Sequence, residues 1–353
     1  MRKNKLILIL ILVLAFYLLY IFLVFPKAAP SYKKQDIVVT TSKWNKTKQD
    51  SLGFYYLERK NKPDVETVLK NCQDSVSIID ITKKSYNTLI LKKSQNKKLH
   101  LTNNYTKCAL SCYSNYLASE NKEFLKIFWA HVDWMVINVE YPLDSVAVWK
   151  NKDVTFKKYN LNFGWASAFA QGYGLSVLSR AYQDSGDEKY LNLAEKVLNS
   201  FDLHYKKGGV MDIDADGNYW YLEFPAEPPA YVLNGMIYAL FGIYDYYIIT
   251  DSPKAHRYFE RGIETLAKNL DQYDLGYWSA YDLYYHDCAS YHYHRYVHIP
   301  QLMSLYDITQ RKVFRDYAGR FRKYLNEPWL TIFKTRFSIE AIIRRIRYKN
   351  PIM

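Results

Sequence analysis

The sequence predicts a mainly α-helical protein, built as an incomplete (α/α) toroid of helical hairpins with a small β-insertion and an N-terminal transmembrane helix. Three observations support this fold class. A long apolar run stands near the N-terminus, a helical pattern recurs four times from about residue 105 onward, and one segment inside it switches to strand character. The 353 residues, 49% of them hydrophobic, are enough for one large core or two modest ones.

The apolar run covers residues 6–25, LILILILVLAFYLLYIFLVF, and contains no charged residue. Its length suits a helix that crosses a hydrocarbon layer of about 30 Å. A cleavable signal is the alternative because Ala28 and Ala29 follow, but the apolar core of a signal has only about 7 to 15 residues. The flanking lysines and arginines are balanced, so the orientation follows the default for a short N-terminal tail. We expect an uncleaved single-pass anchor over residues 1–26 and an extracytoplasmic catalytic domain, in a periplasm, at a cell surface or in a secretory lumen.

The net charge of +13 is concentrated at the two ends of the chain. Residues 1–34 carry six Lys/Arg and no acid, and residues 311–353 carry twelve Lys/Arg against three acids. The body between them has 30 Lys/Arg and 32 Asp/Glu, so it is close to neutral. A uniformly basic surface is not indicated, and we expect no nucleic-acid partner.

A stalk is predicted between the anchor and the helical region, over residues 27–100. Residues 27–60 are polar and rich in lysine, which is typical of a spacer. Residues 61–100 mix short apolar runs with charged turns, which indicates a few strands.

Helical hairpins are predicted over residues 101–330. In each hairpin a tyrosine closes one helix, a short polar turn follows, and an aromatic residue opens the next helix. The four pairs are Tyr116 with Phe124, Tyr182 with Tyr190, Tyr244 with Tyr258 across an insertion, and Tyr306 with Phe314. The leading tyrosines are 66, 62 and 62 residues apart. A single hairpin cannot bury its apolar face, so the four must pack on one another, as an incomplete toroid or alternatively as an open solenoid.

Two further elements are predicted. Residues 208–224, GGVMDIDADGNYWYLEF, have strand character with Asp216-Gly217 as the turn, and this insertion should bring Glu223 to the mouth of the helical array. Within the C-terminal segment 331–353, residues 336–349 form a basic amphipathic helix. Its apolar face comprises Ile339, Ile342, Ile343 and Ile346. Such a helix lies on an anionic membrane, binds an acidic substrate or is merely solvated, and the sequence leaves these open.

Three segments carry motifs long enough to be specific. They are residues 164–182, GWASAFAQGYGLSVLSRAY, residues 222–245, LEFPAEPPAYVLNGMIYALFGIYD, and residues 280–302, AYDLYYHDCASYHYHRYVHIPQL. They resemble, in the same order, three motifs of the catalytic domain of the D-glucuronyl C5-epimerases that act on heparosan-type chains. The second and third correspond to the family's E-Y-P, Y-D-L-R-H and D-Y-H motifs.

The resemblance implies an epimerase that inverts C5 of D-glucuronate to L-iduronate within an acidic polysaccharide, without a cofactor. That reaction needs a base on one face of the ring, an acid on the other, and groups that stabilise charge on the carboxylate. In the family the proton-transfer roles belong to the Glu of E-Y-P and to the tyrosines of Y-D-L and D-Y-H. In this sequence they correspond to Glu223, Tyr281 and Tyr293.

The sequence departs from the family pattern at three places. Phe224 replaces the tyrosine of E-Y-P, which removes a phenol. Tyr284 replaces the arginine of Y-D-L-R-H, so a clamp for the carboxylate must come from elsewhere, and Arg295 is the nearest candidate. The third motif needs a one-residue insertion to align Tyr293 with the family's tyrosine, and without it His294 takes that place.

The remaining candidates are expected to bind substrate or to tune the site. The substrate-binding candidates are Gln171, Arg180, Asn234, His294, Arg295 and His298. Of these, Gln171 and Asn234, together with Gly172, fit positions that line the cleft or bend the backbone. For Tyr281 to act as a base near neutral pH, nearby cations must lower its pKa, and the candidates are His286, His294, Arg295 and His298.

A metal site is the alternative interpretation of the His- and Asp-rich third motif. Its members would be His286, Asp287, His292, His294 and His298. Their spacing matches no defined ligand pattern, so we predict no metal. The four cysteines, Cys72, Cys108, Cys112 and Cys288, are too few and too scattered for a disulfide framework or a zinc ribbon.

Two other functions remain open at this point. A polysaccharide lyase or glycoside hydrolase on the same fold would use the same groups, since a lyase begins with the same C5 proton abstraction. A non-catalytic carbohydrate-binding protein would have kept the fold without the activity. The expected partners are the polysaccharide and the membrane, and self-association as a homodimer is left open.

The first testable prediction concerns the anchor. Burying residues 6–25 in lipid is much more favourable than exposing them to water, so the full-length chain should stay in the membrane fraction after a carbonate wash. A chain that begins at residue 31 should appear in the soluble fraction. Recovery of the full-length chain in that fraction would contradict the prediction.

Overall fold

The computed structural model describes residues 102–152 and 154–348. The predicted anchor at residues 6–25 and the predicted stalk at residues 27–100 lie outside the described residues. Over the described ranges, no helix combines the length and the hydrophobicity needed to cross a bilayer.

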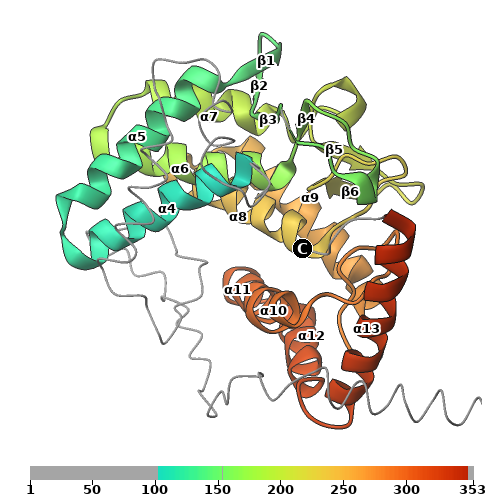
Figure 1. The fold of residues 1–353 in the computed structure, drawn as a ribbon. Helices are drawn as coiled ribbons and strands as arrows, with labels where there is room; N and C mark the ends of the chain where they lie inside the picture. The colour runs from blue at the N-terminus through green and yellow to red at the C-terminus, as the bar shows by residue number, and fades with distance from the viewer. Residues whose placement is uncertain (1–101, 153, 349–353) are drawn as a thin grey trace, which may run out of the picture.

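Four antiparallel helical hairpins form the main body (Figure 1). They are α4 (Thr102–Ser119) with α5 (Lys122–Asn138), α6 (Ala168–Ser185) with α7 (Lys189–Asn199), α8 (Leu233–Thr250) with α9 (Pro253–Asn269), and α11 (Ile299–Thr309) with α12 (Lys312–Lys323). The first helices pack in succession, α4 on α6, α6 on α8, and α8 on the turn that leads into α11. The prediction of a mainly helical protein is confirmed, and the incomplete toroid stays a prediction.

The four hairpin turns share one backbone geometry. Each first helix ends at a residue with φ between 52° and 72°, whose N–H donates to the carbonyl oxygen of a tyrosine four positions earlier. The pairs are Glu120 with Tyr116, Gly186 with Tyr182, Asp251 with Tyr247, and Gln310 with Tyr306. The tyrosine of the third turn is therefore Tyr247, and the predicted pairing of Tyr244 with Tyr258 across an insertion is wrong. In the other three hairpins an aromatic residue stands eight positions after this tyrosine. The position eight residues after Tyr247 is the buried Ala255, so the aromatic pattern does not reveal this turn.

Helices α6 and α8 approach each other backbone to backbone. A Cβ atom at Gly242 would overlap the carbonyl oxygen of Gly172, and one at Gly172 would overlap the backbone of Ala239. Further along the same pair of helices, Arg180 forms a buried ion pair of 2.8 Å with Asp245. Close packing of the two backbones therefore fixes the position of α6 relative to α8.

Three short antiparallel strand pairs complete the body. They are β1 (Glu140–Leu143) with β2 (Val146–Val148), β3 (Lys150–Asn151) with β4 (Trp165–Ala166), and β5 (Met211–Ile213) with β6 (Tyr219–Tyr221). The β5–β6 hairpin is the predicted β-insertion, with Met211 opposite Tyr221, whereas the first two pairs were not predicted. In Figure 1 the strands β3 to β6 gather at one end of the helices. Strands β4 and β6 precede α6 and α8 in the chain, so this is where the loops into these helices lie.

Short helical turns connect the hairpins and lead into α11. They are η1 (Lys157–Tyr159), η2 (Tyr205–Lys207), η3 (Leu270–Tyr273), α10 (Tyr291–Tyr293) and η4 (His294–His298). The last of these is a π-helical turn that joins α10 and α11 without a break. The third motif is therefore part loop and part helix.

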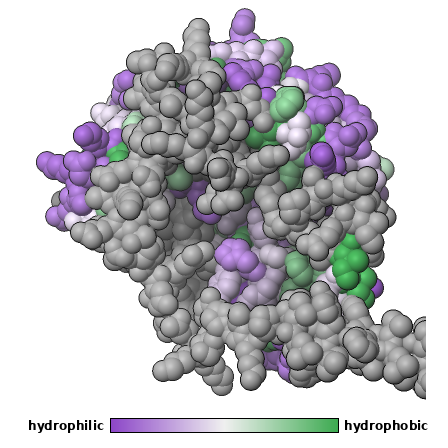
Figure 2. Space-filling model, viewed as in Figure 1, coloured by the Kyte–Doolittle hydropathy of each residue, from purple (hydrophilic) through white to green (hydrophobic). Residues whose placement is uncertain are grey.

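The C-terminal helix α13 (Trp329–Tyr348) begins earlier than predicted and packs on the main body. The Phe333 ring stacks on Trp278 at a centroid distance of 3.8 Å, and Glu340 accepts a hydrogen bond of 2.9 Å from the Cys288 N–H. Figure 2 shows a hydrophobic patch over this helix. The exposed large apolar side chains of α13 are Trp329, Ile332, Ile339 and Ile342.

The contact between α6 and α8 generates the second prediction. Gly242→Ala should lower the free energy of unfolding by about 1 to 3 kcal/mol, because the added methyl group displaces a backbone rather than a side chain. Gly319→Ala is the matched control, since nothing lies within 4 Å of a Cβ atom at this exposed position in α12. The control should gain up to about 1 kcal/mol from helix propensity. Urea denaturation compares the two, and equal effects would contradict the packing argument.

Candidate active site

The first turn of α8 holds the two main proton-transfer candidates. The N–H of Leu233 donates to the carbonyl oxygen of Tyr281 at 3.2 Å. The side-chain amide of Asn234 donates to Oε2 of Glu223 at 3.3 Å. Gly235 leaves space for Glu223, because a Cβ atom there would overlap the Glu223 side chain. Three successive residues of α8 therefore position both candidates.

Backbone bonds deliver Glu223 to this turn. It follows β6, and the preceding residue, Leu222, accepts a hydrogen bond from the N–H of Ala168 at 2.8 Å. The N–H of Leu222 donates to Val210 at 2.9 Å. The carboxyl group is thus held between the start of α6, the β-insertion and α8, and only 5% of the residue is exposed.

Tyr281 and Tyr293 form an edge-to-face pair with ring centroids 5.3 Å apart. Both are partly exposed. The π-helical turn η4 follows Tyr293 directly, and such a turn holds one more residue than an α-helical turn, so it is able to accommodate the one-residue insertion that the third motif needs. Tyr293 contacts Tyr281, whereas His294 points into the core and stacks on Trp278 at 3.7 Å.

Burial sets the acid–base properties of this cluster. It raises the pKa of Glu223 to about 8, against smaller opposing effects of the Asn234 hydrogen bond and the Lys158 charge. Burial, followed by the Glu223 charge, raises the pKa of Tyr281 well above its ordinary value and that of Tyr293 to about 12. The pKa values of both phenols thus depend on the same carboxyl group.

The expectation that nearby cations lower the pKa of Tyr281 is wrong. Burial lowers the pKa of both His294 and His298 to about 3, so both rings are neutral near pH 7. Arg295 stacks over the rings of Tyr291 and Tyr296, with centroid distances of 5.8 and 5.3 Å. Its predicted role as a carboxylate clamp is not supported by these contacts.

Lys158 is the cation that the sequence analysis missed. Its ammonium group contacts Asp282 at 2.8 Å, Asp287 at 3.3 Å and the Tyr159 hydroxyl at 3.0 Å. It also lies 5.4 Å from the centre of the Tyr281 ring. The sequence signal was weak, because Lys158 is one of two adjacent lysines in a short loop far from Tyr281 in the chain.

Two predicted substrate-binding residues have structural roles instead. The side chain of Gln171 donates to the carbonyl oxygens of Trp149 and Ser167 and accepts from the Trp149 N–H, all within 3.0 Å. Arg180 is committed to its buried ion pair with Asp245. Both side chains help to hold α6 in place, so we reassign them to the fold.

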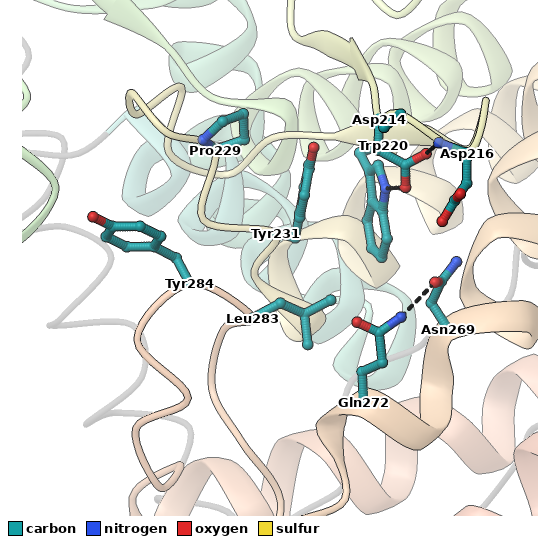
Figure 3. Close-up of a pocket in the computed structure, with 10 residues that line it drawn as sticks. Asp214, Asp216, Trp220, Pro229, Tyr231, Asn269, Gln272, Leu283 and Tyr284 are labelled. Atoms are coloured by element: carbon teal, nitrogen blue, oxygen red, sulfur yellow. Dashed lines mark hydrogen bonds between the residues drawn. The ribbon is translucent and has the colours of Figure 1, made fainter.

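The two substituted family positions have different environments. Phe224 is buried and stacks on Phe156 and Tyr159, each at 4.7 Å, in a small hydrophobic cluster beside the main core. Tyr284 is exposed and lines a groove of about 350 Å³ together with Trp220 and other residues of the β-insertion (Figure 3). Its lining includes Leu283 and Tyr284, two and three residues beyond Tyr281, but none of the proton-transfer candidates.

The described ranges were also searched for a metal site. Within them, no group of three or more His, Cys, Asp and Glu side chains is arranged to hold a metal ion. Cys108, Cys112 and Cys288 are free thiols, and Cys72 lies outside the described residues.

The chain is similar in sequence to one family model and to two known proteins, among others. The family model described as D-glucuronyl C5-epimerase C-terminus matches residues 144–323, about half of the chain. The chain is 34% identical over 215 residues to the D-glucuronyl C5-epimerase of Caenorhabditis elegans, which covers 56% of this chain and 34% of that protein. It is 35% identical over 179 residues to the uncharacterized protein MJ1128 of Methanocaldococcus jannaschii, covering 50% of this chain and 57% of that protein. The chain thus spans between about a third and just over half the length of these relatives.

The raised pKa of Glu223 generates the third prediction. Native Glu223 keeps its proton up to about pH 8, whereas the unfolded chain loses it near the ordinary value of 4.5. The unfolded state therefore binds fewer protons between pH 5 and 8, and this group lowers stability as pH rises. Glu223→Gln should remove this loss in the free energy of unfolding, which amounts to at most about 1.4 kcal/mol per pH unit. Urea denaturation at pH 5 to 8 measures the difference.

Glu227→Gln is the control for this measurement, because Glu227 is exposed and Lys206 holds its pKa below the ordinary value. From pH 5 to 8 its profile should run parallel to that of the unmodified protein. A Glu223→Gln profile that is also parallel would show that the carboxyl group is not buried in its neutral form.

Proposed function

Because the chain belongs to the D-glucuronyl C5-epimerase family, we propose that it inverts C5 of D-glucuronate units to L-iduronate within an acidic, heparosan-type polysaccharide. The observation that carries the proposal is the placement of Glu223 beside Tyr281 and Tyr293 at the first turn of α8. A carboxyl group and a phenol in one site are the two kinds of group that abstraction and return of a proton require.

Glu223 is the proposed base. With its pKa near 8, about a tenth of Glu223 is ionised at pH 7, and this carboxylate is a stronger base than an ordinary one, which is the compromise that general-base catalysis favours. The C5–H bond breaks and the proton goes to a carboxylate oxygen of Glu223. The electron pair stays on C5 and spreads into the C6 carboxylate of the sugar.

Tyr281 is the proposed acid. Its raised pKa keeps the phenol protonated, so it suits proton donation rather than abstraction. The phenolic O–H bond breaks as a C–H bond forms at C5 on the face opposite Glu223, which leaves a phenolate. Tyr293 lies against this ring and is the proposed partner that stabilises the phenolate or supplies the next proton.

Lys158 is the proposed source of positive charge. Charge accumulates on the sugar carboxylate as C5 loses its proton, and a fixed cation stabilises it best where water is excluded. Lys158 acts on Glu223 and lies over Tyr281, so it is near both proposed proton-transfer groups. Its bonds to Asp282 and Asp287 hold it in position.

The fourth prediction tests both assignments by exchange at C5. In deuterated water the full-length protein should place deuterium at C5 of heparosan without shortening the chain, as read by NMR. Tyr281→Phe keeps the ring but removes the acid, and Glu223→Gln removes the base, so each should lower the exchange rate by about 10² to 10⁴. Tyr317→Phe in α12 is the matched control and should exchange at the normal rate.

Three outcomes would contradict the proposal. Near-normal exchange by both variants would show that neither Glu223 nor Tyr281 transfers a proton in the reaction. A product that absorbs in the near ultraviolet and a shortened chain would indicate a lyase. Absence of deuterium at C5 with the unmodified protein and a range of uronate polymers would favour a binding protein.

A further inference from the structure

A chain of buried hydrogen bonds connects the core to the candidate site through Ser279. The Nε2 atom of His294 contacts the carbonyl oxygen of Phe321 at 2.9 Å. The Nδ1 atom of His294 contacts the hydroxyl of Ser279 at 2.8 Å and its N–H at 3.2 Å. The same hydroxyl contacts Nδ1 of His298 at 2.8 Å. All three side chains are fully buried.

These contacts fix the protons on both imidazoles. A carbonyl oxygen only accepts, so Nε2 of His294 carries the single proton of this neutral ring and its Nδ1 is an acceptor. The Ser279 hydroxyl must therefore donate its only hydrogen to His294. Its contact with His298 is then a hydrogen bond only if Nδ1 of His298 donates. In the neutral His298 ring, Nε2 consequently has no proton and is an acceptor.

Gln301 presents a second acceptor on the same helix. Its side-chain amide donates to the carbonyl oxygen of Asn234 at 3.1 Å, which fixes the orientation of the group and leaves Oε1 as the free end. Among the described residues, neither Nε2 of His298 nor Oε1 of Gln301 has a hydrogen-bond partner, and both are buried. Unpartnered buried acceptors are costly, which points to a ligand that donates.

The two acceptors lie beside the proposed catalytic groups. The ring of His298 is 6.5 Å from that of Tyr293. Gln301 is bonded to Asn234, which is in turn bonded to Glu223. We propose that His298 and Gln301 form a wall of acceptors that binds free ring hydroxyl groups of the hexuronate. This assignment rests on the proposed function, since it specifies how the same site holds its sugar.

The wall has a consequence for substrate choice. A sugar hydroxyl can donate to Nε2 or Oε1, whereas an O-sulfate or O-methyl group at the same position offers no donor. An O-sulfate would also bring further charge into a buried region that has neutral imidazoles and amides. The site should therefore accept uronates with free hydroxyl groups and discriminate against units substituted there.

The fifth prediction uses two substitutions at His298. In His298→Asn the amide nitrogen can replace Nδ1 as donor to Ser279, but nothing replaces Nε2. In His298→Gln the longer side chain can place an acceptor near the Nε2 position. With heparosan, His298→Asn should lower kcat/KM for C5 exchange by about 10- to 100-fold, mainly through KM, and His298→Gln should recover most of the loss.

A second measurement uses the unmodified protein, so its result does not depend on whether the variants fold. Nitrogen-15 NMR of the histidine side chains, assigned with His298→Gln, should show a protonated Nδ1 and an unprotonated Nε2 on His298. The Nε2 signal should move when a heparosan oligosaccharide binds. A protonated Nε2, or a signal unchanged by saturating oligosaccharide, would overturn the assignment.

The experiments separate this inference from the proposed function. Normal C5 exchange with an unchanged KM in His298→Asn would refute the acceptor wall and leave the epimerase intact. Absence of C5 exchange in the unmodified protein, with an Nε2 signal that still responds to the oligosaccharide, would refute the epimerase and leave the hydroxyl-binding wall intact.

Discussion

Two adjacent residues in the first turn of α8 join three parts of the site. The side chain of Asn234 donates to Glu223 and its carbonyl oxygen accepts from Gln301, while the N–H of Leu233 donates to Tyr281. The helix carrying these groups is fixed in turn by its backbone contact with α6 at Gly172. The distance between Glu223 and Tyr281 thus depends on helix packing.

Burial, rather than nearby opposite charges, sets the proton affinities of the groups in this site. Removal from water raises the pKa of both the Glu223 carboxyl group and the Tyr281 phenol, and the phenol starts from the higher ordinary value, so the two groups differ widely in proton affinity. The imidazoles of His294 and His298 stay neutral for the same reason. Under the proposed function, the uronate brings the charge of its own carboxylate into these surroundings.

The sequence predicted the elements that depend on periodic patterns and on long motifs. Helical spacing located the hairpins, the Asp216-Gly217 turn located the β-insertion, and the motifs named residues that the fold brings together. Features that depend on three-dimensional contacts were missed. The third hairpin turn, at Tyr247, has the same backbone geometry as the others, but an alanine replaces its aromatic partner. Lys158 lies near Tyr281 although more than a hundred residues separate them in the chain.

Burial also could not be deduced from residue type. Histidine and arginine near Tyr281 suggested a cationic surrounding, but the direction of each side chain decides whether it faces the phenol or the core. The proton positions on His298 follow from a contact with Ser279, nineteen residues earlier in the chain, which no local pattern indicates.

The π-helical turn η4 has a consequence for how this helix can change. In a regular α-helix each residue advances about 100° around the axis, so one extra residue rotates everything on one side of it relative to the other. The turn therefore uncouples the face that presents Tyr293 from the face that presents Gln301. Either end of the helix can therefore differ in orientation without a matching change at the other end.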